Sequence, residues 1–367
     1  MKTRDAVLLY EAAQADTDTK ILDIDLADPI SAFYIEVRST NGATSNKGNY
    51  ISDIVTKIEV VDGSEVFHSL NMFQEEAMCF YKTGKVPVMF PSEWPSGIQR
   101  HGVYLLFGHY LWDPTLCFVP TSYKNPQLKI TFNKAKIRAA GTDGFATGDN
   151  ILLTVVAKVI EEGASPMGFL MQKQIESFTA ATSGDKRIEL PTDYPYSMIL
   201  CRFWLTAYDI DLIIEKLKLT CDTDKFIPFD RYVKQLDAEA FAMFGASRLK
   251  HDIFTQNHQN VRLLNNKEPD CRVWGSETGL DRIINTWYQW GSQLRTRIVN
   301  HDGIPVAADE RFTMVEEGHA LHSTLPVLFG IYGNPGDYFP APNYGKVELV
   351  LSQIAAGLCE IVLEQKR

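Results

Sequence analysis

Histidine and acidic side chains come together once along this chain in a spacing that could bind a metal ion. The segment Glu316-Glu317-Gly318-His319-Ala320-Leu321-His322 places two carboxylates and two imidazoles within seven residues. Zinc hydrolases instead place two histidines four residues apart on a helix, with a glutamate directly after the first. The His319-x-x-His322 spacing lacks that arrangement, so we interpret the segment as an exposed polar loop.

The other histidines that could bind a metal are dispersed. A duplicated β-barrel of the bicupin type would need closely spaced histidines and a glutamate in each half. His68, His101 and His109 of the first half are spread over a long stretch, which indicates packing or surface roles. No cofactor is therefore expected.

The segment 141–150 is rich in glycine and aspartate and could in principle bind calcium. Asp143, Asp149 and Asn150 supply oxygen atoms there, but the twelve-residue ligand pattern of a calcium loop is absent. Glycine and aspartate runs of this kind mostly form turns. We expect turns in this segment and no metal site.

The sequence also lacks the motifs that assemble catalytic chemistry. It contains neither the Gly-x-Ser-x-Gly turn of a nucleophilic serine nor the Gly-x-x-x-x-Gly-Lys-Ser/Thr loop that binds nucleotide phosphates. Tryptophan could stack on sugars or bases, although burial in cores and subunit interfaces is commoner. The six are Trp94, Trp112, Trp204, Trp274, Trp287 and Trp290. We predict that the protein is not an enzyme and assign no catalytic, cofactor-binding or metal-binding residues.

Charge and composition restrict the partners. The 367 residues are 45% hydrophobic with a net charge of -10, and no block of basic residues occurs, so direct binding to nucleic acid is not expected. Apolar runs are too short to span a bilayer, and the N-terminus is too short and acidic for a signal peptide. Six widely spaced cysteines without a Cys-x-x-Cys pair indicate reduced thiols in a protein made inside a cell.

Short segments that alternate apolar and polar residues recur between turn-forming clusters, which favours strands. The clearest are Ile21–Leu26, Ala32–Val37, Ile54–Val61, Leu128–Phe132, Ile151–Ile160, Met198–Leu205, Ile214–Leu219, Val347–Leu351 and Leu358–Leu363. Helices are few. One is predicted after Asn71, with Gln74 completing a capping box, and a second after Asp237, ending at Gly245.

These elements follow one plan twice. Lys57-Ile58-Glu59-Val60 precedes a turn and a helix, as does Lys216-Leu217-Lys218-Leu219. Leu106-Phe107-Gly108 leads to one strand pair, and Leu328-Phe329-Gly330 leads to another. The offset between the copies grows from 159 residues at Lys57 to 222 at Phe107, so the second copy carries an insertion.

The repeat predicts an all-β chain of two tandem eight-stranded antiparallel jelly rolls, with short helices and a long loop insertion in the second roll. We place an N-terminal arm at 1–20, the first roll at 21–162, a linker at 163–170 and the second roll at 171–367. The insertion covers about 245–325, and its structure stays open, because Thr286–Gln293 fits either a helix or a strand.

The order of several segments is similar to that of double jelly-roll major capsid proteins of the adenovirus-like lineage of tailless, often membrane-containing viruses. The segments are Ile58–Phe67, Leu105–Gly108, Tyr123–Thr131, Gly168–Leu170 and Gly184–Asp193. The resemblance implies a homotrimer that forms a nearly hexagonal tile of an icosahedral virion shell, assembled inside the host cell. It further implies contacts with neighbouring trimers and with minor capsid or penton proteins, and it admits an internal viral membrane as a partner.

A second hypothesis is a carbohydrate-active enzyme or glycan-binding protein, because tandem jelly rolls also occur in such proteins. It requires a cleft between the rolls lined by paired carboxylates and exposed tryptophans.

Overall fold

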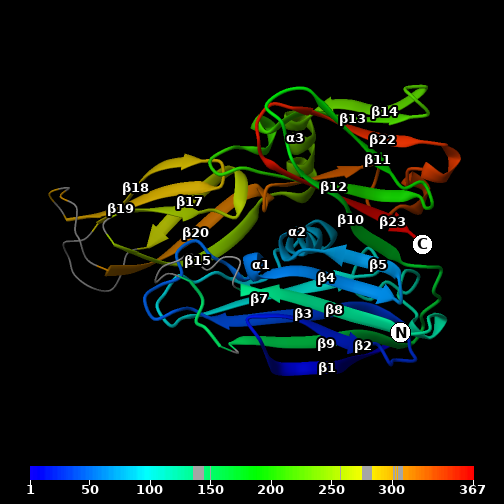
Figure 1. The fold of residues 1–367 in the computed structure, drawn as a ribbon, viewed down its shortest axis with the longest axis horizontal. Helices are drawn as coiled ribbons and strands as arrows, with labels where there is room; N and C mark the ends of the chain where they lie inside the picture. Colours follow the sequence, from blue (N-terminus) through cyan, green and yellow to red (C-terminus); the bar gives the residue numbers. More distant parts are fainter. Residues whose placement is uncertain are drawn as a thin grey trace.

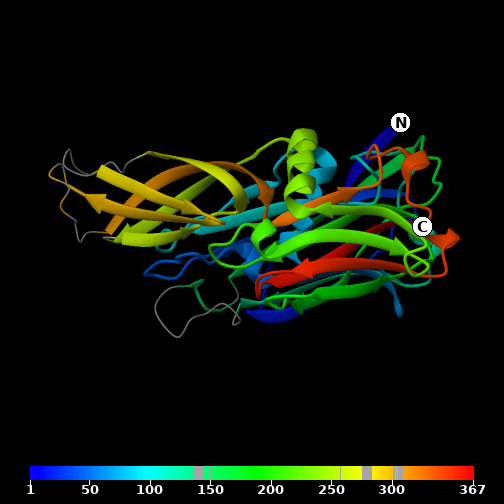
Figure 2. The ribbon, with the colours of Figure 1, turned by 90° about the horizontal axis from the view of Figure 1, so that it is seen from above.

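Two β-sandwiches lie side by side, with a helix between them and a smaller β-lobe at one end (Figure 1). The computed structural model describes residues 1–134, 144–148, 150–256, 258–274, 283–300, 302, 304 and 309–367. Both chain termini lie at the end opposite the lobe, as Figure 2 also shows. The molecule is therefore elongated, with its termini and its insertion at opposite ends.

The first sandwich consists of two sheets that pack face to face. The order of the first sheet is β1 (Lys2–Gln14), β9 (Ile151–Glu162), β3 (Ile30–Thr40), β7 (Ile98–Leu106) and the short edge strand β6 (Val88–Phe90). The order of the second is β2 (Thr17–Asp23), β8 (Pro126–Asn133), β4 (Val55–Asp62) and β5 (Glu65–Leu70).

The second sandwich repeats this order, except that the short edge strand β6 has no counterpart. Its first sheet is β10 (Leu170–Thr179), β23 (Leu358–Lys366), β12 (Tyr196–Trp204) and β21 (Thr324–Leu328). Its second sheet is β11 (Asp185–Leu190), β22 (Val347–Gln353), β13 (Ile214–Cys221) and β14 (Phe226–Tyr232). The predicted pair of eight-stranded antiparallel rolls is confirmed.

Alternation of side chains explains why these segments form sandwich strands. In β8, Leu128, Ile130 and Phe132 are fully buried, and the residues between them are half-buried on the other face. The buried residues of the first roll form one apolar cluster and those of the second roll form another. Each roll thus has its own core, as a domain requires.

The helices follow the repeat as well. They are α1 (Ile51–Ile54), α2 (Met72–Thr83) and α3 (Val233–Phe244), with three-residue 3-10 turns at Pro120–Ser122, Ile210–Leu212, Pro335–Asp337 and Ala341–Asn343. The predicted capping box is confirmed: Asn71 Oδ1 accepts from Gln74 N, and Gln74 Oε1 accepts from Asn71 N, both at 3.0 Å. No helix among the described residues is both long and apolar enough to span a bilayer.

Two expectations were wrong. Residues 1–20 are not a free arm, because β1 pairs with β9 and β2 pairs with β8, which completes both sheets of the first roll. The second helix begins at Val233 rather than after Asp237, because β14 runs directly into it and Tyr232 at the N-cap makes no side-chain cap. Asp237 is instead buried inside the helix and pairs with His319.

The insertion forms the lobe, which consists of two three-stranded sheets. One is β15 (Ser247–Gln256), β20 (Asp309–Leu321) and β17 (Asn265–Trp274), and the other is β16 (His258–Arg262), β19 (Gln293–Val299) and β18 (Ile283–Trp290). The segment that the sequence left open is therefore mostly strand. A small core of its own includes Val261, Leu294 and Phe312.

The two rolls meet at a seam. There β10 runs parallel to β5 over two residue pairs, Gln172 with His68 and Lys173 with Ser69. This short contact joins a sheet of each roll edge to edge, while the cores stay separate. A third apolar cluster fills the space between α2 and the second roll and includes Met78, Phe80, Leu200 and Val362.

Candidate functional site

Helix α2 carries charged side chains that are buried between the rolls. Glu76 Oε1 lies 2.6 Å from His101 Nδ1 of the first roll, and Glu76 Oε2 lies 2.6 Å from His322 Nε2 of the second. Lys82 Nζ lies 2.9 Å from Glu364 Oε2 on β23. Helix α2 therefore links the rolls through buried polar contacts: Glu76 lies between a histidine of each roll, and Lys82 forms an ion pair with Glu364.

The charge state of these groups follows from their surroundings. Burial by itself would raise the pKa of Glu76, but the charges of His101 and His322 outweigh it and hold the pKa at about 2. Burial lowers the pKa of His322, and Glu76 opposes that effect only in part. The pKa of Glu364 is lowered, because Lys82 outweighs the effect of burial. Both carboxylates are therefore ionised at neutral pH.

A second group of polar contacts lies at the start of α2. Arg202 Nη1 on β12 donates to Glu360 Oε2 at 2.9 Å, and Asn71 Nδ2 donates to Glu360 Oε1 at 3.1 Å. The Arg202 guanidinium also lies 4.4 Å from the centre of the Phe73 ring. Both ends of α2 are thus fixed to the second roll.

The lobe, although inserted in the second roll, is attached to the first. Glu93, before β7, accepts hydrogen bonds from Gly48 N at 3.0 Å and from Gln259 Nε2 of β16 at 2.7 Å. Burial raises the pKa of Glu93 to about 7. Arg262 of the lobe forms a further ion pair with Asp53 at 2.9 Å. The lobe therefore adds a second connection between the rolls.

The cleft between the rolls does not have the geometry of a glycosidase site. A pocket of about 390 Å³ is lined by Asp53, Glu360 and Trp204 among others. Each of these carboxylates is bound to an arginine, Asp53 to Arg262 and Glu360 to Arg202. Glycoside hydrolysis needs one carboxyl group as acid and another free as nucleophile or base. The paired carboxylates required by the second hypothesis are not found in this pocket.

Similarity to solved structures extends over the whole chain. The major capsid protein of STIV matches with a TM-score of 0.60 and 12% identity, covering 100% of this chain and 96% of that chain. The major capsid protein P2 from bacteriophage PM2 matches with a TM-score of 0.55 and 9% identity, covering 100% and 97%. The PBCV-1 virus capsid matches with a TM-score of 0.58 and 10% identity, covering 100% and 93%.

The chain has the double jelly-roll fold. The expected resemblance to double jelly-roll capsid proteins is confirmed at the level of the fold. Comparison of the sequence with models of protein families gives no match, and comparison with curated proteins gives none either.

In this double jelly-roll chain, the predicted metal-like segment is divided among separate partners. Glu316 Oε2 lies 2.7 Å from His251 Nε2, and His319 Nδ1 lies 3.2 Å from Asp237 Oδ1. His322 contacts Glu76. The segment is not an exposed loop, because β20 is the central strand of its sheet and buries Glu316 and His319. Within the described ranges, no group of three or more His, Cys, Asp or Glu side chains could hold a metal ion.

The dispersed histidines are buried in separate places. His68 Nε2 lies 2.7 Å from Glu75, His101 contacts Glu76, and His109 Nε2 contacts the Tyr338 hydroxyl. Each therefore makes its polar contact at a different place inside the protein.

The remaining candidates are placed only in part. Asp143 and Asp149 lie outside the described residues, and Asn150 Nδ2 donates to Thr147 O at 2.6 Å in a local turn. The side chains of Trp274, Trp287 and Trp290 also lie outside the described part. Those of Trp94, Trp112 and Trp204 are half-buried.

The buried charges on α2 and on the strand that faces it, β23, were not predicted. Glu360 and Glu364 alternate with the core residues Ile361 and Leu363 on β23, a pattern that normally indicates a solvent-facing side. The signal that was available is α2 itself, whose glutamates stand among apolar residues on every side of the helix. A helix of that kind is typical of burial between two bodies.

Proposed function

We propose that this chain is a major capsid protein that assembles as a homotrimer, and that these trimers tile an icosahedral virion shell. The observation that carries the proposal is the double jelly-roll fold, shared over 100% of this chain with major capsid proteins of STIV and PM2. We propose a structural role and no enzymatic one.

The duplicated roll gives a physical reason for trimers. Two rolls per chain in the same strand order supply six similar wedges when three chains meet. Such a ring closes with threefold symmetry, so its contacts do not continue into a fibre. The tile is then nearly hexagonal and can pack against six neighbours in a shell.

We further propose the residue limits of the parts. The first roll takes in the residues before 163, the linker is 163–170, and the second roll is 171–367 with the lobe inserted at about 245–325. The position of the lobe at the end opposite both termini (Figure 1) supports an outward-facing lobe and an inward-facing terminal end. Minor capsid or penton proteins are then partners at the tile edges, and an internal membrane is a partner at the terminal end.

Light scattering of the purified full chain tests the proposal. We expect a mass of three chains, and hexagonal tiles or shells in electron micrographs of concentrated protein. A stable monomer under every salt and pH condition would contradict it. Saturable binding on a glycan array together with such a monomer would favour the carbohydrate-binding hypothesis instead.

A further inference from the structure

Helices α2 and α3 occupy the same place in the two rolls. Each has 12 residues and follows the last strand of the second sheet. Each ends at a glycine with positive φ, 65° at Gly84 and 71° at Gly245. Each glycine N–H donates to a phenylalanine carbonyl four residues earlier at 2.8 Å, from Gly84 to Phe80 and from Gly245 to Phe241. The glycines therefore align the helices residue by residue.

The two helices differ in what covers their outer side. The residues of α2 from Met72 to Lys82 are all buried, whereas α3 buries only a stripe that includes Val233, Leu236 and Ala240. Phe80 is 3% exposed, but its counterpart Phe241 is 44% exposed, and Met243 beside it is 61% exposed. An apolar helix face has therefore been left uncovered in the second copy alone.

Inside the chain, the outer side of α2 is covered by the outer face of sheet β10-β23-β12-β21. Leu200 and Val362 of that face belong to the apolar cluster around Phe80. Lys82 and Phe73 of α2 contact two charged side chains of the same face, Glu364 and Arg202.

The first roll carries the counterpart of that face on sheet β1-β9-β3-β7. Leu200 on β12 pairs with Val362 on β23, and at the corresponding place in the first roll Tyr34 on β3 pairs with Val156 on β9. Tyr34 and Val156 are half-buried, and Val7, which pairs with Val156 on β1, is 61% exposed. Around these three residues the sheet face therefore lacks the cover that α2 gives to its counterpart.

We infer that the outer side of α3 packs on the outer face of β1-β9-β3-β7 of a second copy of this chain. The contact that α2 makes with the second roll inside each chain is then repeated between chains. This inference rests on the proposed function, because it names the surfaces that join copies within the trimer. A contact between two different faces closes into a ring when the rotation between rolls is constant.

Charge at the two faces agrees with this pairing. Within the chain, Arg202 lies over the ring of Phe73 at 4.4 Å. When the helices are aligned at Gly84 and Gly245, Phe73 of α2 corresponds to Lys234 of α3. When the sheets are aligned by their strand pairs, Arg202 of β12 corresponds to Glu36 of β3. A lysine of one copy therefore meets a glutamate of the next. Glu36 accepts hydrogen bonds from Arg100 Nε and Tyr34 Oη at 2.8 Å each, and a carboxylate can accept more than two.

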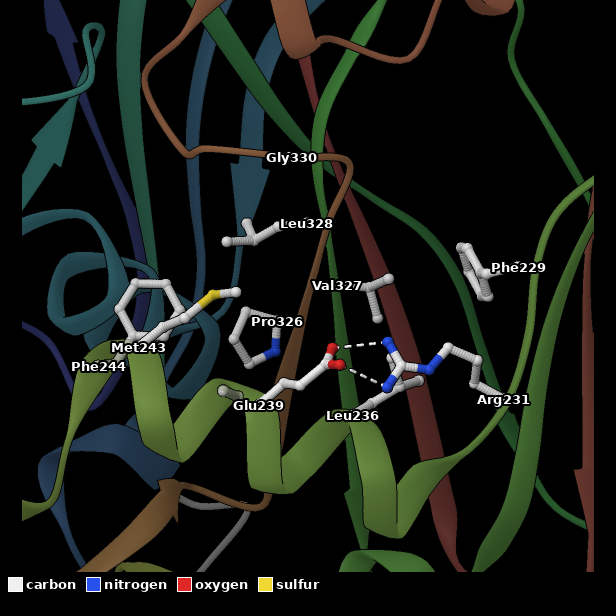
Figure 3. A pocket seen from close by; sticks show the side chains of 11 residues that line it. Phe229, Arg231, Leu236, Glu239, Met243, Phe244, Pro326, Val327, Leu328 and Gly330 are labelled. Carbon is white, nitrogen blue, oxygen red and sulfur yellow. Dashed lines mark hydrogen bonds and ion pairs between the residues drawn. The ribbon is translucent and has the colours of Figure 1, made fainter.

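The inner side of α3 packs against β21, which fixes the position of the helix. Figure 3 shows α3 lying across β21, with Arg231 and Glu239 joined by two hydrogen bonds of 2.6 Å. The pocket between them holds about 160 Å³. Substitutions on the exposed side of α3 therefore leave its attachment to β21 in place.

Cysteine cross-linking tests which faces meet. Lys234→Cys and Glu36→Cys are combined in a Cys271→Ser background, because the other five native cysteines are buried. A short thiol-to-thiol cross-linker is expected to join chains into dimers and trimers on a denaturing gel. The control combines Lys234→Cys with Lys57→Cys, whose side chain is 51% exposed on the other sheet, and should stay uncross-linked. Equal cross-linking of both pairs would overturn the inference.

Charged substitutions on α3 test the same contact without cross-linking. Lys234→Glu, which would bring a second carboxylate against Glu36 of the next copy, is expected to shift the mass in light scattering from three chains to one, with the circular dichroism spectrum unchanged. The control Lys57→Glu reverses a charge on the other sheet, where the side chain is 51% exposed, and should leave the mass at three chains. A trimer that persists in Lys234→Glu, together with no cross-link between Lys234→Cys and Glu36→Cys, overturns this inference but leaves the proposed function intact. A wild-type chain that never forms an oligomer overturns the proposed function itself.

Discussion

Replacing Lys82 by methionine tests whether α2 holds the rolls together through buried charge. The substitution keeps the aliphatic stem but removes the ammonium, which lies 2.9 Å from Glu364 Oε2 and 3.0 Å from Leu106 O. The side chains of Lys82 and Glu364 are only 1% and 0% exposed, so water cannot replace the lost partner. Removing one member of a buried pair typically costs about 3–5 kcal/mol. Because Gln172 and Tyr332 still donate to Glu364, at 2.7 and 3.2 Å, we expect about 3 kcal/mol, the lower end of that range.

Denaturant unfolding at one fixed chain concentration measures this loss, because assembly shifts the apparent stability by mass action. The double variant Lys82→Met/Glu364→Gln removes both charges and should recover most of the stability, since replacing a whole buried pair is often nearly neutral. Lys216→Met is the matched control, because its pair with Asp230 is 34% and 42% exposed, so water replaces the lost partner and stability should change little. If Lys82→Met costs no more than this control, or if the double variant loses the sum of both single effects, the buried-charge explanation is refuted.

Further predictions concern pH and the cap of α2. The pKa of Glu76 is held at about 2 against an ordinary 4.5, and that of His322 is lowered from 6.5, so the unfolded chain takes up protons first on acidification. Stability should therefore fall as pH drops below about 6.5 and again below about 4.5, and Glu76→Gln should flatten the slope below 4.5 in denaturant titrations. Burial raises the pKa of Glu93 from 4.5 to about 7, so the folded chain keeps this proton longer than the unfolded chain. Glu93 therefore lowers the stability as the pH rises from 4.5 to 7, and Glu93→Gln should remove this loss. Asn71→Ala should cost about 1 kcal/mol through the lost cap, and Asn71→Ser should restore most of it in the same unfolding assay.

Much of the fold could be predicted because sandwich strands obey local alternation. The predicted strands Leu128–Phe132 and Ile151–Ile160 lie within β8 and β9. Alternation alone does not say how strands are grouped into sheets, and the duplicated order of the strands supplied that information. The start of α3 was misplaced because Asp237 has the residue type of a cap, yet its carboxylate pairs with a histidine 82 residues away. Only the folded chain brings that histidine near.

The contacts between the rolls were beyond local reasoning for a related reason. Glu360 and Glu364 alternate with core residues, and alternation identifies the face that points away from the core without saying what lies against it. In a single sandwich that face meets water. Here it meets α2, so the same pattern describes a buried interface.

The unequal burial of α2 and α3 suggests how a duplicated chain distributes its charges. A buried charge is tolerable only if its partner is always present, and inside one chain that condition holds from the moment of folding. Lys82 and Glu364 meet it, and their counterparts on the faces proposed to join copies are Met243 and Lys158, which are not an ion pair. Met243 is 61% exposed in the single chain. Exposure of a methionine before assembly costs little free energy, whereas a lysine buried without a partner would cost much more. The contact inside the chain can therefore be permanent and charged, whereas a contact between chains must tolerate both states. We therefore expect Met243→Glu, which would place a carboxylate opposite Lys158 of the next copy, to slow assembly rather than to stabilise the contact. Both charges would have to lose water before they could meet.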